Sequence, residues 1–188
     1  IEPGILYVAP LLFLAPRFKH SMDLLQCKWA RMLLNCTHGP PLNWALLRIQ
    51  CGWTMRLSSK VLEATFIAFA RLQLLPQAHP GARMLLLACT LGADTWVARV
   101  RVAFTAPGLP EPIPELAECG LFDGHAIRQA QSEKGVRSEL LRRYRKAIVR
   151  PILQEMDNRI LQAAITAHAS FPPYSLADFI VVFPRNFM

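Results

Sequence analysis

The sequence is poor in acidic residues, and no two of them are adjacent. It has 13 Asp and Glu against 21 Lys and Arg among its 188 residues, so the formal net charge is +8. Two-metal catalysis needs closely paired carboxylates. Nucleotide sites commonly carry G-x-G-x-x-G or a P-loop, zinc proteases carry H-E-x-x-H, and serine hydrolases carry G-x-S-x-G. None of these patterns occurs in the chain. We therefore expect a protein that is not an enzyme and that holds no cofactor.

Cysteine offers neither a disulfide framework nor a metal site. The five cysteines form no C-x-x-C pair and are odd in number, so disulfides cannot use all of them. Cys27, Cys36 and Cys51 are expected to be small buried hydrophobic residues in a reducing compartment. Their spacing with His38 fits no structural zinc pattern, and we predict no metal there.

The chain has no hydrophobic run that could cross a membrane, which takes about 18 to 20 consecutive apolar residues. The best candidate, the uncharged residues 3–16, is shorter and is interrupted by Pro10. It also lacks the basic start and the cleavage site of a signal peptide. We expect a buried or interfacial segment, no transmembrane helix and, because the sequence begins with Ile1, a processed or trimmed product.

Hydrophobic residues, in contrast, are abundant. They make up 53% of the sequence, and the mean hydropathy is +0.25. Proteins that only coat nucleic acid usually combine positive charge with polar, solvated residues. A chain that is both basic and apolar is expected to be buried in something larger. We predict a large assembly in an organelle, mitochondrion or plastid, with the nucleus as the alternative location.

Apolar residues recur at three- and four-residue spacing over most of the chain, which predicts helices. The stretch "VARVRVAF", residues 97–104, fits a strand equally well because apolar residues alternate with two arginines. After a short element, a basic helix is expected, then a kink or restart at Pro151, and a last helix to about His168. The earlier helices are expected to begin at Ser21, Leu42, Ser58 or Ser59, Pro80 and Asp94.

A proline-rich segment divides the chain. "TAPGLPEPIPEL", residues 105–116, has four prolines within eight residues, which excludes helix and favours an extended tether. We predict an N-terminal helical domain over residues 1–104, a linker over 105–116, and a C-terminal basic helical region with an apolar tail over 117–188. The expected fold class is mainly α, an irregular helical bundle with a proline-rich tether and a C-terminal helical arm.

The basic helix, "SELLRRYRKAIVRP" at residues 138–151, is amphipathic. With about 100° between successive residues, one side carries Leu140, Leu141, Tyr144, Ala147 and Ile148, and Val149 is an apolar residue on the opposite, basic side. A solvated surface and a binding surface for an anionic partner are both compatible with the pattern. The basic face consists of Arg142, Arg143, Arg145, Lys146 and Arg150.

One stretch resembles a known family. "LQCKWARMLLNC" carries Trp29 followed by Leu33 and Leu34, and further on come Gly52–Trp53, Arg56–Leu57 and residues 70–75, rich in Ala, Arg and Leu. These positions resemble the helical region downstream of the catalytic palm in reverse transcriptases of non-LTR (LINE-type) retroelements. The later "RYRKAIVRPILQEMDNRILQAA" is similar to further downstream sequence of such reading frames.

The chain departs from that family in its catalytic part. The palm of these enzymes carries two adjacent aspartates, and this chain has no Asp-Asp. Gln50 and Cys51 stand where an acidic residue is expected before the Gly-Trp pair. The resemblance therefore implies a thumb-like helical fragment without a polymerase, reused for a structural purpose.

Two functions of different classes follow. The first is a non-catalytic accessory subunit of a large assembly, which binds other protein subunits through apolar surfaces and meets protein, RNA or lipid headgroups through the basic face. The second is a nucleic-acid-binding module, ribosomal-type or a relic reverse-transcriptase thumb, whose basic face contacts phosphates. The hydrophobicity favours the first, and the charge and the family resemblance favour the second.

Overall fold

The computed structural model describes residues 18–33, 51–91, 95–105, 107–108 and 124–169, and every regular element within these ranges is helical. The predicted mainly α fold is confirmed. The elements are α2 (Phe18–Leu33), α4 (Leu57–Gln73), α5 (Pro80–Thr90), α6 (Trp96–Thr105), α8 (Gly124–Ser132), α9 (Lys134–Tyr144), the π-helical turn η1 (Arg145–Val149) and α10 (Arg150–Ala169).

Several predicted features lie outside the described residues. These are the apolar segment 3–16, the helix expected from Leu42, the tether residues 109–116 and the tail after residue 169. The proposed division into domains stays a prediction. None of the described helices is long and apolar enough to cross a membrane.

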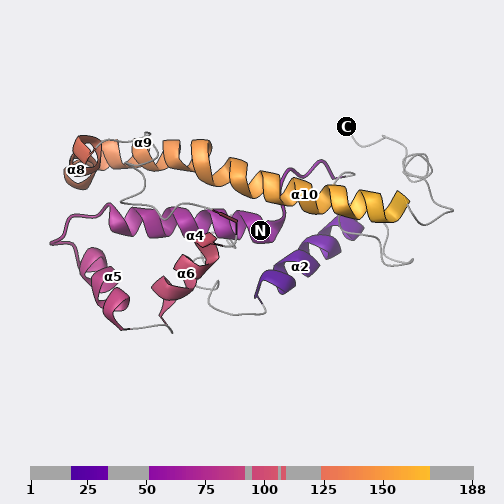
Figure 1. The fold of residues 1–188 in the computed structure, drawn as a ribbon, viewed down its shortest axis with the longest axis horizontal. Helices are drawn as coiled ribbons and strands as arrows, with labels where there is room; N and C mark the ends of the chain where they lie inside the picture. Colours follow the sequence, from indigo (N-terminus) through magenta and orange to yellow (C-terminus); the bar gives the residue numbers. More distant parts are fainter. Residues whose placement is uncertain (1–17, 34–50, 92–94, 106, 109–123, 170–188) are drawn as a thin grey trace.

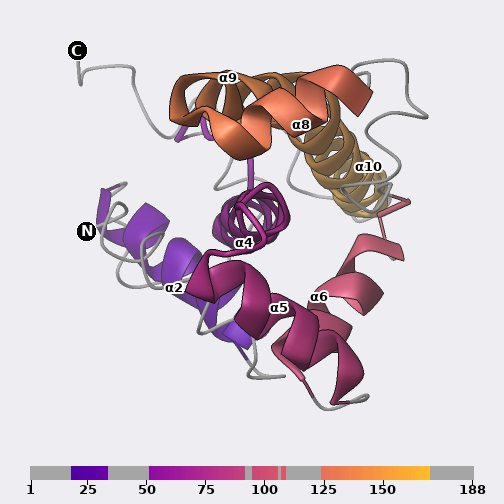
Figure 2. The same ribbon diagram turned by 90° about the vertical axis from the view of Figure 1, so that its left-hand side faces the viewer.

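Helix α4 is the centre of the bundle. Figures 1 and 2 show it between two groups of helices, with α8, α9 and α10 on one side and α2, α5 and α6 on the other. Helices α2, α5, α6, α9, η1 and α10 all contact α4. Its apolar side is largely buried, with Phe66 and Phe69 fully inaccessible to solvent.

The core joins residues from before and after residues 105–116. Phe66 of α4 stacks on Phe104 of α6, with ring centroids 4.1 Å apart. Tyr144 and Leu153, which follow the tether in sequence, belong to the same buried cluster. Aromatic side chains bury the largest apolar areas, so this cluster is the main apolar contribution to the stability of the fold.

Local sequence accounts for the start of α5. Pro80 lies in the first turn of α5, as predicted, and His79 Nδ1 accepts a hydrogen bond from the Gly81 amide. The alternating stretch 97–104 is helical in α6, because Val97, Val100 and Phe104 follow helical spacing toward the core. The expectation that Ser21 caps its helix is wrong, since α2 begins at Phe18 and Ser21 lies inside it.

The basic helix changes its winding at residues 145–149. Here η1 adds one residue to the turn, and the Arg150 amide donates to the Arg145 carbonyl five residues earlier. Pro151 explains the position of this turn, because its ring would clash with the carbonyl of residue 147 in a continuous α-helix and it has no amide hydrogen to donate. The restart expected at Pro151 takes the form of a π-turn, after which α10 begins at Arg150.

The π-turn moves two side chains to the opposite sides from those predicted. Val149, expected on the basic side, is fully buried, whereas Ala147, expected on the apolar side, is exposed. In α10, Leu153 and Asp157 are buried, and Ile152 and Met156 pack partly buried against the core, while Ala163 is exposed.

Candidate functional site

The first part of the basic face is held by a neighbouring acidic residue. Glu139 accepts hydrogen bonds from Arg142 Nη2 at 2.6 Å, Arg142 Nε at 2.7 Å and Arg143 Nε at 2.9 Å. These residues lie three and four positions apart on α9, where side chains meet on a helix surface. The Arg142 and Arg143 side chains are 55% and 63% exposed, so the group is a solvated surface cluster.

The Glu139 carboxyl is expected to stay ionised in acid. Its hydrogen bonds from Arg142 and then Arg143 lower its pKa from 4.5 to about 2. Because the folded-state pKa lies below the unfolded value, the two pairs favour the folded chain above about pH 4.5, and this contribution is lost as the pH falls through about 2. An NMR titration should place the midpoint near 2 in the native chain and nearer 4.5 in the Arg142→Gln/Arg143→Gln variant. A native midpoint near 4.5 would contradict the pairing.

The second part of the basic face turns toward α4. Arg145 Nε and Arg150 Nε both donate to Glu63 Oε1, at 2.5 Å and 3.0 Å. Glu63 is only 2% exposed, although it lies on the central helix of the bundle. Five α-helical residues rotate by about 500°, which leaves two side chains about 140° apart. The extra residue of η1 brings Arg145 and Arg150 to the same side, and both reach one carboxylate.

A polar pocket of about 270 Å³ lies beside this ion pair. The first turns of α4 and the η1–α10 junction enclose it. The Arg145 and Arg150 side chains are 47% and 41% exposed, so the pocket is open to solvent along their guanidinium groups. Its lining residues are Thr54, Met55, Lys60, Glu63, Ala64, Arg145, Arg150 and Gln154.

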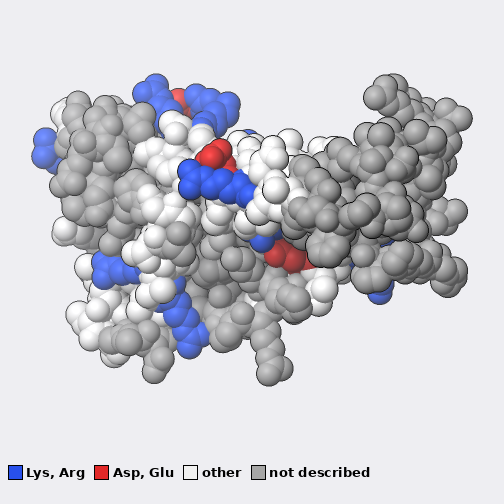
Figure 3. Space-filling view, turned by 45° about the vertical axis from the view of Figure 1, so that its right-hand side comes forward, with Lys and Arg blue, Asp and Glu red and all other residues white. Residues whose placement is uncertain are grey.

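The five residues of the basic face are therefore not arranged as one continuous surface. Two contact Glu139, two contact Glu63, and Lys146 is exposed on η1. Figure 3 shows Lys and Arg side chains in separate groups over the described surface, some of them directly against acidic side chains. The prediction that all five share one side assumed uniform α-helical rotation, which η1 interrupts. Their binding of an anionic partner stays a prediction.

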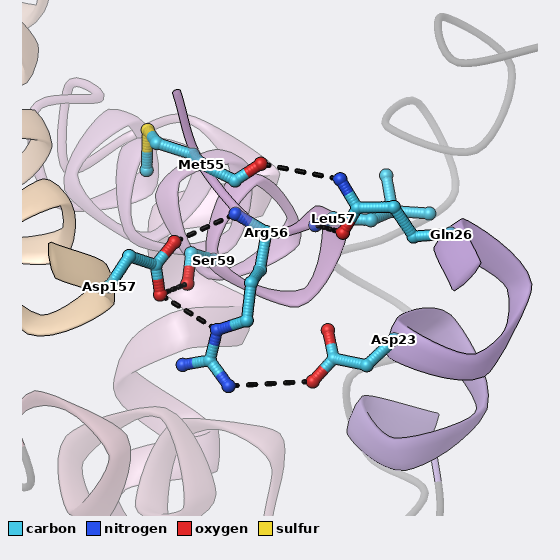
Figure 4. Close-up of polar contacts among 7 residues, drawn as sticks. All are labelled: Asp23, Gln26, Met55, Arg56, Leu57, Ser59 and Asp157. Atoms are coloured by element: carbon cyan, nitrogen blue, oxygen red, sulfur yellow. Dashed lines mark hydrogen bonds and ion pairs between the residues drawn. The ribbon is translucent and has the colours of Figure 1, made fainter. Parts of the chain in front are cut away.

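A second polar cluster ties the start of α4 to α2 and α10 (Figure 4). Asp157 of α10 accepts from the Arg56 amide at 2.7 Å, from Arg56 Nε at 2.8 Å and from Ser59 Oγ at 2.8 Å. Gln26 of α2 accepts from the Leu57 amide at 2.7 Å. Side chains of two other helices thus satisfy amides at the N-terminus of α4, where a local capping residue usually does so. Ser58 and Ser59 were expected to open this helix, but it begins at Leu57.

Sequence reasoning missed Glu63 and Asp157, the two acidic residues that are buried in the described part of the chain. Each lies on a buried helix face. Glu63 lies three residues before Phe66, and Asp157 lies four residues after Leu153. A carboxylate on an apolar stripe is rarely buried without a partner. That rule could have predicted basic partners for both, but not which ones.

Neither Cys27 nor Cys51 has the character of a reactive cysteine, and the described residues contain no candidate metal centre. Burial raises the pKa of the Cys51 thiol, and burial together with the nearby Asp23 raises that of Cys27. Reactive cysteines instead have lowered pKa values, because the thiolate is the nucleophile. Among the described residues, no three His, Cys, Asp or Glu side chains come together as metal ligands would.

Comparison with known proteins leaves the site to be judged on its own geometry. No protein family, curated protein or solved structure shows a significant match to the chain.

Proposed function

We propose that the chain is a non-catalytic accessory subunit of a large multi-protein assembly, and that the outer side of α5 docks onto a neighbouring protein subunit. The observation that carries the proposal is the apolar character of α5 on both of its sides. Its inner side packs against the bundle through Ala82, Leu85 and Ala88. Its outer side, which we call the α5 surface, consists of Met84, Leu87 and Leu91.

The α5 surface is exposed to an unusual degree for such large apolar residues. Met84, Leu87 and Leu91 are 65%, 52% and 67% exposed, and they follow three- and four-residue spacing. Leu86 on α5 and Val102 on α6, which contacts α5, are also exposed, at 61% and 70%. A helix that is apolar on both sides is normally buried, and contiguous exposed apolar residues mark interaction sites.

The rest of the proposal rests on composition and sequence resemblance. The combination of positive charge with 53% hydrophobic residues supports an assembly in an organelle, mitochondrion or plastid. The motifs around Trp29 and Gly52–Trp53 support an origin from the thumb-like helical region of a retroelement reverse transcriptase. The absence of paired carboxylates and nucleotide-binding motifs from the sequence supports a role without catalysis.

Changing the α5 surface to polar residues tests the proposal. The variant Met84→Gln/Leu87→Gln/Leu91→Gln should keep its helical content, since these side chains lie outside the core. Its incorporation into the native assembly should fall by at least about tenfold, because central apolar anchors each contribute more than about 1 kcal/mol to an interface. Gradient sedimentation of extracts from the source cells, with tagged wild-type chain alongside, measures the bound fraction.

The matched control changes exposed residues elsewhere. Glu155→Gln/Arg159→Gln alters an exposed pair on α10, and it should sediment with the assembly as the wild type does. If the α5 variant is incorporated as fully as this control, the α5 surface is not the docking site and the proposal is wrong.

Nucleic-acid binding is the second candidate, and the exposure of the outer basic residues favours it. Arg142, Arg143 and Lys146 are exposed on one stretch of helix. If all three contact phosphates of a duplex, the affinity for the duplex falls as the salt concentration rises. The Arg142→Gln/Arg143→Gln/Lys146→Gln variant would then reduce the slope of log affinity against log salt by about 2 to 3. A wild-type affinity with no salt dependence would exclude this function.

A further inference from the structure

The pocket beside η1 carries more positive charge than its buried carboxylate requires. Two cationic side chains, Arg145 and Arg150, line it together with Glu63, the one acidic side chain that pairs with both. The formal charge of these three groups is therefore +1. One cation is sufficient to neutralise a buried carboxylate, so the ion pair alone does not explain the remaining charge or the open space of about 270 Å³.

Among the described residues, the two arginines use only part of their hydrogen-bonding capacity. Each donates through Nε to the same oxygen of Glu63, and a guanidinium has five N–H donors in a planar fork. Within the described residues, Glu63 is the only acidic partner of either side chain. Gln154, one turn after Arg150, adds a neutral amide to the same lining. Donors from η1 and α10 therefore converge on one space.

We propose that this pocket binds a phosphate group. Phosphate carries about −1.5 to −2 charges near neutral pH and presents three acceptor oxygens, which suit the positive charge and the planar donor forks of the two arginines. Drug-sized ligands occupy pockets of about 300 to 1,000 Å³. A volume of about 270 Å³ instead suits inorganic phosphate or the phosphate end of a small ligand.

The π-turn is what assembles the site. Without the extra residue, Arg145 and Arg150 would point about 140° apart, and one of them would leave the pocket. Single-turn π-helical segments within α-helices occur frequently at functional sites, because they re-aim side chains that regular helices separate. The inference does not depend on docking by the α5 surface, which lies on the other side of α4 (Figure 2).

Calorimetric titration of the full chain with inorganic phosphate, at ionic strength held constant with sodium chloride, tests the proposal. Saturable binding of one phosphate per chain is expected. The same titration is carried out with adenosine 5′-monophosphate and with adenosine for comparison. Binding of the monophosphate at least as tight as that of phosphate assigns the site to phosphate esters, and weaker binding assigns it to the free ion. Adenosine should not bind, and absence of saturable binding by both phosphates overturns the proposal.

Three variants locate the site. Arg145→Gln should weaken phosphate binding by about ten- to hundredfold, because a charged hydrogen-bond donor is lost. Its matched control, Arg142→Gln, alters an arginine of similar exposure that contacts Glu139 instead, and it should bind as the wild type does. Glu63→Gln should tighten binding by at least about threefold, because the competing negative charge is removed.

The Glu63→Gln result separates a ligand site from an ion pair that only stabilises the fold. If Arg145 and Arg150 serve only to neutralise Glu63, removing that charge gives no gain in phosphate affinity. Equal weakening by Arg145→Gln and Arg142→Gln, with both variants folded by circular dichroism, would also overturn the assignment.

Discussion

Replacing Asp157 with alanine is expected to lower the free energy of unfolding by about 3 to 5 kcal/mol, because it removes one partner of a buried ion pair. Asp157 is fully buried and accepts three hydrogen bonds, two of them from Arg56. The Arg56 side chain is only 9% exposed, so water cannot replace the lost carboxylate. Single domains are typically stable by about 5 to 15 kcal/mol, so the variant loses a large part of its stability.

Urea unfolding followed by circular dichroism measures this change. Glu155→Ala is the matched control, two residues away on the same helix, and it breaks an exposed pair with Arg159. Exposed pairs of this kind contribute about 0 to 1 kcal/mol, so the control should unfold close to the wild type. If Asp157→Ala costs no more than this control, the polar cluster at the start of α4 does not hold the helices together.

The second large effect is expected at Val149, which η1 turns from the basic side of the helix into the core. Val149→Lys should destabilise the chain by about 3 to 5 kcal/mol, because it loses a buried apolar side chain and places an unpaired charge in the core. Ala147→Lys introduces the same side chain two residues earlier, at an exposed position, and should change stability by less than about 0.5 kcal/mol.

The order of these two effects distinguishes the π-turn from a continuous α-helix. Uniform α-helical rotation puts Val149 on the outer, basic side and Ala147 on the apolar side. In that arrangement Val149→Lys would be tolerated and Ala147→Lys would destabilise the fold. Thermal unfolding of the two variants under identical conditions decides between the arrangements, and the opposite order would contradict the structure.

The helices themselves could be predicted because local spacing determines them. The stripe through Phe66 and Phe69 and the start at Pro80 follow from side-chain periodicity and from the fixed φ angle of proline. Residues 97–104 could not be assigned from pattern alone, because two arginines among apolar residues fit both the helical and the strand periodicity. Packing decides this case, because a helix buries Val97, Val100 and Phe104 together against α4.

The candidate site could be predicted only in part, because its geometry depends on one inserted residue. The composition of the basic helix indicated Arg145 and Arg150 as binding residues. Their relative orientation could not be predicted, because three- and four-residue spacing describes a regular α-helix and not a π-turn. Glu63 precedes these arginines by 82 and 87 residues, and only the folded bundle brings them together. Asp157 was missed for the same reason, since its partner Arg56 lies 101 residues away.

The π-turn therefore has consequences for function as well as for packing. It separates the basic residues into a solvated group at Glu139 and a pocket at Glu63. The outer group is the part proposed to meet a large anionic surface, while the pocket is proposed to bind a small anion. The proposed protein docking involves a different surface, on α5, which consists of apolar residues.

Scalar coupling across the backbone hydrogen bond of Arg150 tests the π-turn most directly. In the structure, the Arg150 amide donates to the Arg145 carbonyl. An NMR experiment that detects through-hydrogen-bond coupling should therefore correlate the Arg150 nitrogen with the carbonyl carbon of Arg145. A correlation with the carbonyl carbon of Lys146 would show a continuous α-helix, and would contradict the placement of Val149, Arg145 and Arg150.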